Sequence, residues 1–137
     1  MIAVDLARQL AAAGVRWEPV EGDRFAIPDK GMDTTVFVVA TMVVDVVGAS
    51  GRNLLRFNGT VEWALDSIQQ EEVVWLPSEE QLRGLLGRAF RALSRDDSGG
   101  YRVELDVAGR VASRSAFDAA DAYAHALLLL AVGEDDR

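Results

Sequence analysis

The stretch SEEQLRGLLGRAFRALSRDDSGGYRVELDVAGRVASR, residues 78–114, holds the signals of a helix followed by those of a strand hairpin. Ser78 and Gln81 have the spacing of a capping box, in which each side chain accepts a hydrogen bond from the other residue's backbone N–H. Apolar residues then recur at intervals of three and four, the period of a helix with one buried face. They are Leu82, Leu85, Leu86, Ala89, Phe90 and Leu93. We therefore expect a helix from Ser78 to Leu93.

Strict alternation marks the segment after this helix. Asp96 to Gly100 is a polar loop, and from Tyr101 to Val107 apolar residues alternate with Arg, Glu and Asp. An alternation with period two predicts a strand with one buried and one solvated face. Ala108-Gly109 then provides a turn into a second strand from Arg110 to Arg114, so a β-hairpin is expected here.

The rest of the chain divides between helical and strand patterns. Helical patterns cover residues 2–13, a segment of about ten residues from Thr60, and residues from about 116 to 130. Strand patterns cover residues 16–20, 24–28, 34–47, 53–57 and 73–76. This order predicts an α+β fold with a mainly antiparallel sheet of about five to seven strands and about four helices. A parallel pairing around the middle helices is the alternative.

Apolar faces indicate which residues form the core. Trp75 lies within the apolar segment 73–76, and Trp17 lies beside an expected edge strand, so both are predicted to be core residues. The last helix is expected to bury one face. That face comprises Phe117, Ala120, Ala124, Leu127, Leu128 and Ala131.

Length, composition and charge indicate one globular domain. The chain has 137 residues, of which 50% are apolar and 26% are charged, and a chain of this length can bury a substantial core. We expect a single domain over residues 1–132 and a solvated tail over residues 133–137. The net charge of −8 opposes general nucleic-acid binding, which requires a local surplus of Lys and Arg.

Missing residues and segments exclude several classes of protein. The chain has no cysteine, which excludes disulfides, thiolate nucleophiles and cysteine-ligated metals. Its only lysine, Lys30, follows no glycine-rich run, so no Walker-type phosphate loop is present. Asp5 and Arg8 interrupt the first apolar segment, which opposes a secretory signal, and no apolar run is long enough to span a membrane. We expect a cytoplasmic protein.

Two carboxylates share one side of the helix expected after Thr60. Glu62 and Asp66 are four residues apart, and such a pair could bind a metal or divide acid and base roles. A metal site of this kind needs further ligands such as histidine, and the only histidine, His125, lies on the last helix. Glu62 is also explained by the favourable interaction of a carboxylate with a helix N-terminus. We therefore expect neither a metal nor a catalytic residue here.

Trp63 lies on the opposite side of the same helix from its apolar residues. Val61, Leu65 and Ile68 share an arc of the helix, and Trp63 falls nearly opposite that arc. A large aromatic side chain on the polar face is typical of an interface anchor or a pocket wall, but a second packing layer over that side of the helix is the favoured explanation.

Two other groups of charged residues have both a functional and a structural explanation. Arg88, Arg91 and Arg95 lie opposite the leucines of the helix expected from Ser78 to Leu93, and such a stripe could contact an anion or a nucleic acid, but a solvated face that pairs with the protein's own carboxylates is favoured. Asp121 and His125 are four residues apart on the last helix, but no nucleophile elbow accompanies them, so a solvated pair is favoured over a catalytic one.

Three stretches resemble a family of small proteins of high-GC bacteria that has no established function. They are GDRFAIPDKGMD (22–33), FNGTVEWALDS (57–67) and VVWLPSEEQLRGLLG (73–87). The resemblance extends over nearly the whole chain. Members sometimes carry a pilus-assembly label, and the resemblance supplies no catalytic or ligand-binding residues.

These observations favour a non-enzymatic, cytoplasmic binding or protein-interaction module. The expected partner is another protein or a second copy of the chain, contacted through a surface that includes Trp63. The alternative is a small enzyme or ligand-binding protein with a pocket around Glu62, Asp66 and Trp63. Neither hypothesis requires a cofactor, a nucleic acid or a membrane.

Overall fold

The chain forms two compact units in a computed structural model that describes residues 1–27, 32–39, 44–49, 52–57, 67–69 and 73–135. Unit 1 combines Met1–Val15 with Pro77–Arg137, and unit 2 is the intervening segment Arg16–Leu76. Unit 1 is therefore assembled from both ends of the sequence. A single domain over residues 1–132 with a tail over 133–137 stays a prediction.

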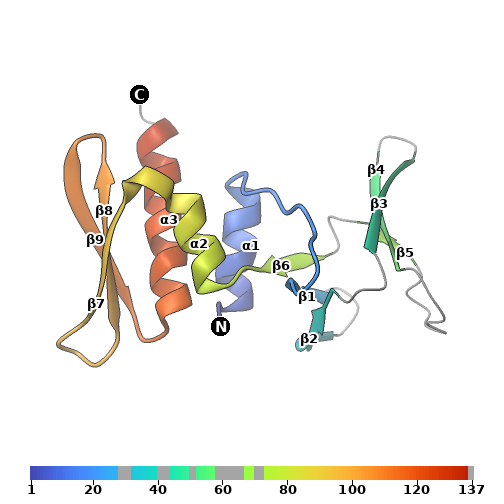
Figure 1. Cartoon of the computed structure of the whole chain (residues 1–137), viewed down its shortest axis with the longest axis horizontal. Coiled ribbons are helices and arrows are strands. Elements are labelled where there is room, and N and C mark those ends of the chain that lie inside the picture. Colours follow the sequence, from blue (N-terminus) through green and yellow to red (C-terminus); the bar gives the residue numbers. More distant parts are fainter. Residues whose placement is uncertain (28–31, 40–43, 50–51, 58–66, 70–72, 136–137) are drawn as a thin grey trace. The chain divides into compact units, whose positions relative to one another are not determined.

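Unit 1 contains three α-helices and a three-stranded sheet among its described residues. Its elements are α1 (Val4–Ala12), α2 (Glu79–Leu86), the 3-10 turn η3 (Gly87–Ala89), β7 (Phe90–Arg95), β8 (Tyr101–Val107), β9 (Arg110–Ala116) and α3 (Ala119–Asp135). The strands pair antiparallel in the order β7-β8-β9, with α3 along one face of the sheet and α1 and α2 packed on α3 (Figure 1).

The core of unit 1 lies between α3 and the sheet. Val103 and Leu105 of β8 are fully buried, and the residues that alternate with them face the other side of the sheet: Arg102, Glu104 and Asp106. α3 is buried over most of its first ten residues because it contacts the sheet and both other helices. The predicted strand 101–107, its turn and the strand after it are confirmed.

The predicted helix from Ser78 to Leu93 is right at its start and wrong after Leu86. The capping box forms, with Ser78 Oγ accepting from Gln81 N at 3.1 Å and Gln81 Oε1 accepting from Ser78 N at 2.9 Å. The helix ends because Gly87 has φ 56° and ψ −126°, a conformation in which a side chain is strained. Phe90 then begins a strand.

A β-bulge explains why β7 has helical spacing in the sequence. Phe90 is opposite Leu105 and Leu93 is opposite Val103, so three steps along β7 correspond to two along β8. The extra residue places Phe90 and Leu93 on the same face of the sheet although they are an odd number of residues apart. Their spacing of three therefore matches that of one helix face.

Unit 2 contains six strands in two antiparallel sheets among its described residues. The strands are β1 (Arg24–Ile27), β2 (Met32–Val38), β3 (Val44–Ala49), β4 (Arg52–Phe57), β5 (Ser67–Gln69) and β6 (Val74–Leu76). The sheet orders are β2-β1-β6 and β3-β4-β5. All strand pairs described in either unit are antiparallel, so the α+β antiparallel fold class is confirmed.

Aromatic side chains form the core of the first sheet in unit 2. Phe25 is directly opposite Phe37 on one side and Trp75 on the other, which makes a cross-strand row of three aromatic residues. Trp17 packs on this row, with its ring 5.6 Å from Phe25 and 6.5 Å from Trp75. Trp17 is buried as predicted, and Trp75 is partly buried against the same cluster.

A buried carboxylate holds Trp17 in this cluster. Asp23 is only 5% exposed, and its Oδ2 accepts hydrogen bonds from Trp17 Nε1 at 2.9 Å and from Val20 N at 3.0 Å. These bonds give a partner to the indole N–H of Trp17 and to a backbone N–H of the turn that precedes β1. The segment 16–20 is consequently not a strand, contrary to prediction.

Three further expectations about elements need comment. The predicted strand 34–47 is divided between β2 and β3, which belong to different sheets. The helix predicted from Thr60 falls mostly outside the described residues, and its end is wrong, because Ser67–Gln69 pairs with β4. The described residues hold nine strands and three α-helices, whereas we predicted about five to seven strands and about four helices.

Two glycine substitutions test where α2 ends. Gly84→Ala should stabilise the protein by about 0.5–1 kcal/mol, because Gly84 is an exposed helix residue with open space around it. Gly87→Ala should destabilise it by about 1–3 kcal/mol, because Gly87 has positive φ. Urea unfolding followed by circular dichroism measures both. A helix that continued past Gly87 would instead be stabilised by both substitutions.

Tyr123 of α3 offers a second stability test. It is fully buried and packs 5.8 Å from Phe90, but its hydroxyl has no hydrogen-bond partner among the described residues. A buried unpaired hydroxyl costs about 1–3 kcal/mol, so Tyr123→Phe should leave the free energy of unfolding unchanged or raise it. Tyr101→Phe is the control. A clear loss of stability in Tyr123→Phe alone would contradict this description.

Candidate interaction surface

The residues first proposed for binding lie outside the described part of the structure. Glu62, Trp63 and Asp66 fall within residues 58–66, so their contacts and exposure are not described. The proposed contact through Trp63 and the alternative pocket around these three residues both stay predictions.

The arginine stripe does not form as predicted. Arg88 lies in η3, while Arg91 and Arg95 lie in β7, because α2 ends at Leu86. All three are exposed, and the Arg95 guanidinium lies 4.9 Å from the centre of the Tyr101 ring. A cation over an aromatic face is attracted by the ring quadrupole. Arg91 and Arg95 therefore belong to the sheet and Arg88 to the turn before it, so the three do not share one helix face.

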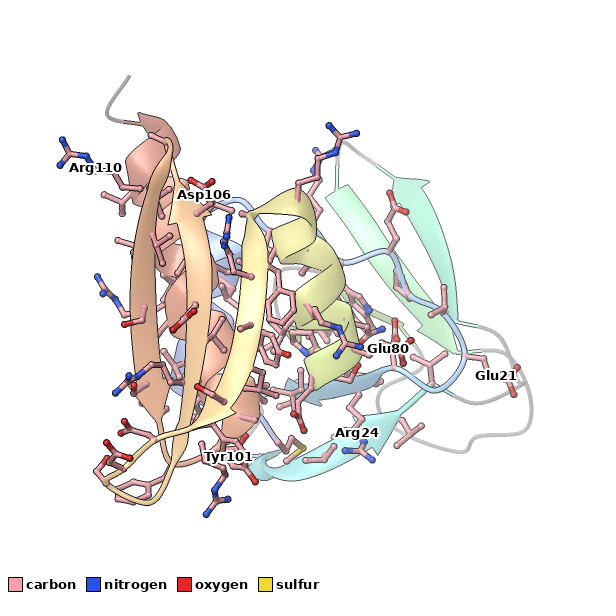
Figure 2. All side chains as sticks on the ribbon, turned by 60° about the vertical axis from the view of Figure 1, so that its left-hand side comes forward. Glu21, Arg24, Glu80, Tyr101, Asp106 and Arg110 are labelled. Atoms are coloured by element: carbon pink, nitrogen blue, oxygen red, sulfur yellow. The ribbon has the colours of Figure 1, made fainter. Side chains whose placement is uncertain are left out.

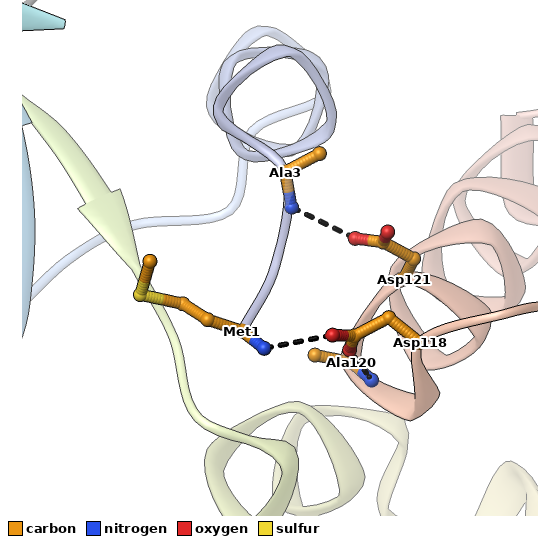
Figure 3. A network of polar contacts seen from close by, with 5 residues as sticks. All are labelled: Met1, Ala3, Asp118, Ala120 and Asp121. Atoms are coloured by element: carbon orange, nitrogen blue, oxygen red, sulfur yellow. Dashed lines mark hydrogen bonds and ion pairs between the residues drawn. The ribbon is translucent and has the colours of Figure 1, made fainter. Parts of the chain in front are cut away.

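Asp121 holds the residue that precedes α1. Its Oδ1 accepts a hydrogen bond from Ala3 N at 2.8 Å (Figure 3). Across the described ranges, no three His, Asp or Glu side chains are arranged to hold a metal ion. None of the described helices combines the length and apolar character needed to cross a bilayer.

Phe117 is an aromatic residue whose exposure was not predicted from the sequence. We predicted it on the buried face of the last helix, but it is 82% exposed. The prediction is wrong because α3 begins only at Ala119. Asp118 acts as the capping residue: its Oδ1 accepts from Ala120 N at 2.8 Å and its carbonyl accepts from Ala122 N. Phe117 therefore lies before the helix and outside the core.

The backbone at Phe117 is held closely on its β9 side. Gly100 is buried, and a Cβ at Gly100 would lie 2.3 Å from the carbonyl oxygen of Ala116 and 2.9 Å from the Cα of Phe117. Only glycine allows two backbone segments to approach so closely. The loop before β8 is thus packed against the residue that carries the exposed phenyl ring.

The backbone is held equally on its α3 side. The Met1 ammonium group donates to Asp118 Oδ2 at 2.8 Å, beside the capping bond from Ala120 N to Oδ1 (Figure 3). Asp118 therefore binds the first residue of the chain and the first turn of α3 together. These contacts flank Phe117 and fix its main chain.

We group Phe117 with three residues that are linked to its chain neighbours Ala116 and Asp118 directly or through one another, and we call the group the Phe117 surface: Met1, Arg95, Tyr101 and Phe117. Tyr101 is directly opposite Ala116 in the β8–β9 pair and opposite Arg95 in the β7–β8 pair. Tyr101 lies at the opposite end of the sheet from Asp106 and Arg110 (Figure 2). Met1 is 56% exposed. Aromatic residues, methionine and arginine are the types enriched at protein interfaces.

Comparison with protein-family models, with curated proteins and with solved structures finds no match to this chain. The surface must therefore be interpreted from its own residues.

Asp118 makes the stability of unit 1 dependent on pH. Partial burial acts to raise the pKa of Asp118, but hydrogen bonds from the Met1 ammonium group and Ala120 N–H outweigh it and hold the pKa below its ordinary value. A carboxyl with a lowered pKa in the folded state stabilises that state above its unfolded pKa, and the contribution is lost as the pH falls through the folded pKa.

We therefore expect Asp118→Asn to lower the free energy of unfolding at neutral pH. The difference from the wild type should shrink as the pH falls below about 4, the ordinary range of an aspartate pKa. Urea unfolding at several pH values measures this difference. Asp97→Asn, at an exposed carboxylate of the same unit, is the control. A difference that is independent of pH would show that the Asp118 charge does not stabilise the fold.

Proposed function

We propose that this protein is a non-enzymatic, cytoplasmic interaction module that contacts a protein partner through the Phe117 surface. The observation that carries the proposal is the exposure of Phe117, 82%, on a main chain held by Gly100 on one side and Asp118 on the other. Trp63 stays a second proposed contact of the same module.

Rigidity is the reason that this phenyl ring is suited to binding. A side chain on a mobile loop loses conformational freedom when it is ordered at an interface, at a cost of about 0.5–1.5 kcal/mol for each ordered side chain. A phenylalanine has only two side-chain torsions, and the main chain of Phe117 is already fixed by its neighbours. Most of the apolar area that a partner covers would then contribute to affinity.

The neighbouring residues support a protein partner in preference to a small molecule. Arg95 and Tyr101 can combine apolar contact with hydrogen bonds at the same site, and Met1 adds an adaptable apolar side chain. Hot spots of protein interfaces are enriched in tyrosine and arginine surrounded by such weaker contacts.

The test compares Phe117→Ala with a matched substitution elsewhere. The full chain is immobilised and exposed to an extract of its source cells, and the affinity of each retained protein is then measured with purified components. Phe117→Ala should weaken the specific partner about 30-fold, the effect of losing a hot spot of about 2 kcal/mol. Val132→Ala, at an α3 residue that is 58% exposed, should retain the partner.

Both variants should unfold at the same urea concentration as the wild type, because neither side chain is buried. Equal retention by Phe117→Ala and the wild type would contradict binding through the Phe117 surface. Absence of any specifically retained protein would contradict the interaction module itself.

A further inference from the structure

We propose that β9 is a docking edge for an acidic, extended protein segment, which adds to the sheet as a further antiparallel strand and begins beside Phe117. This inference rests on the proposed function, since it names the kind of partner that the Phe117 surface takes. β9 leads directly into Phe117, so a strand added along it reaches that surface.

β9 is the regular edge of the sheet in unit 1. Among the described strands it pairs with β8 alone, and all seven of its residues are in register. The other edge strand, β7, is interrupted by the bulge between Phe90 and Ala92. An edge strand presents a row of N–H and C=O groups that an extended peptide can pair with, and a bulge disrupts that row. β9 is therefore the better template.

The charge of the sheet favours an acidic partner. Residues 90–116, which form the sheet, contain five arginines and four carboxylates, whereas the rest of the chain contains nine Lys or Arg and eighteen Asp or Glu. Two of those four carboxylates have partners within the sheet: Asp96 accepts from Arg102, and Asp106 accepts from Gly109 N. The sheet is thus a basic region of an acidic protein.

Two arginines of β9 bring exposed positive charge to the edge of the sheet. Arg110 and Arg114 are both exposed, and neither forms an ion pair with another described residue. They are four residues apart on one strand, so they share a face of the sheet. An antiparallel partner strand would place carboxylates opposite both arginines if its own acidic residues were also four apart.

The opposite face of β9 specifies an apolar residue in the partner. Val111 is 63% exposed and faces away from the side that carries Arg110 and Arg114. A partner residue directly opposite Val111 would be apolar and would immediately precede the carboxylate opposite Arg110. Continuing the register along β9 brings the start of the partner strand to Phe117.

The same arginines disfavour two other occupants. Pairing β9 with β9 of a second copy places arginines of both chains along one seam, where like charges repel. A nucleic acid would neutralise the arginines, but its phosphate backbone has no N–H donors for the open carbonyl groups of the strand. An acidic peptide satisfies the charges and the backbone together.

The experiment uses three synthetic peptides and the full-length protein. The first, Leu-Thr-Thr-Glu-Thr-Thr-Val-Glu, places its glutamates opposite Arg114 and Arg110. The second exchanges the last two residues, so that the glutamates lie on opposite faces while the composition is unchanged. The third carries lysine in place of both glutamates of the first. Binding is measured by the shifts of backbone amide NMR signals during titration.

The first peptide should bind about three- to tenfold more tightly than the second, since only the first can pair both charges, and exposed ion pairs are individually weak. High salt should reduce this preference. The double variant Arg110→Glu with Arg114→Glu should reverse it and prefer the lysine peptide. Arg83→Glu with Arg88→Glu changes the net charge equally but lies off β9, and should retain the preference for the first peptide.

Equal binding of the first two peptides, or signal shifts that map away from β9, would overturn the inference. It would also be overturned if the wild type self-associated and the β9 double variant did not. Displacement of the first peptide from β9 by single-stranded RNA would overturn it as well. Loss of the cellular partner in Phe117→Ala is measured separately. If that loss occurs while the peptides are not distinguished, the acidic strand is wrong and the interaction module stands.

Discussion

The contact between the first residues of the chain and the start of α3 is the constraint on which unit 1 depends. Met1 and Asp118 are 117 residues apart, and so closing the chain between them has an entropic cost that local contacts cannot offset. Burial of apolar surface on α3 offsets this entropic cost, because α3 packs against the sheet, α1 and α2. Asp118 and Asp121 then fix α1 against the first turn of that helix. The position of Asp118 as a cap also leaves Phe117 outside the core, so the same few bonds close the unit and create its exposed aromatic surface.

The sequence predicted correctly those elements that are determined by interactions between residues close together in the chain. The capping box of Ser78 and Gln81, the alternation of β8 and the turn at Gly109 all involve neighbours in sequence, and all were confirmed. The end of α2 was missed because the spacing of Phe90 and Leu93 is that of a helix face in sequence and that of a bulged strand in space. The conformation of Gly87 decides between the two, and the apolar spacing itself carries no information about that conformation.

The candidate surface could not be predicted, because exposure at an element boundary is a tertiary property. A shift of three residues in the start of α3 transfers Phe117 from a buried face to solvent. Sequence reasoning had one available signal, since Asp118 is a favoured cap residue and is followed by Ala119 and Ala120. The arginines were identified correctly as exposed, but their grouping changed when the helix that was to carry them proved to be a turn and an edge strand. The placement of Trp63 lies outside the described residues.

The insertion of unit 2 within unit 1 has a consequence for the order in which the protein is made. During synthesis on the ribosome, α1 emerges first, but α3, the described element against which α1 mainly packs, is translated last. The aromatic cluster around Phe25 is complete once Trp75 has emerged. Unit 2 can therefore form its core before α3 is available to cover α1. During this period the nascent chain would contain a folded unit 2 and an α1 whose apolar face is still exposed. A chaperone would then have one short apolar segment to protect.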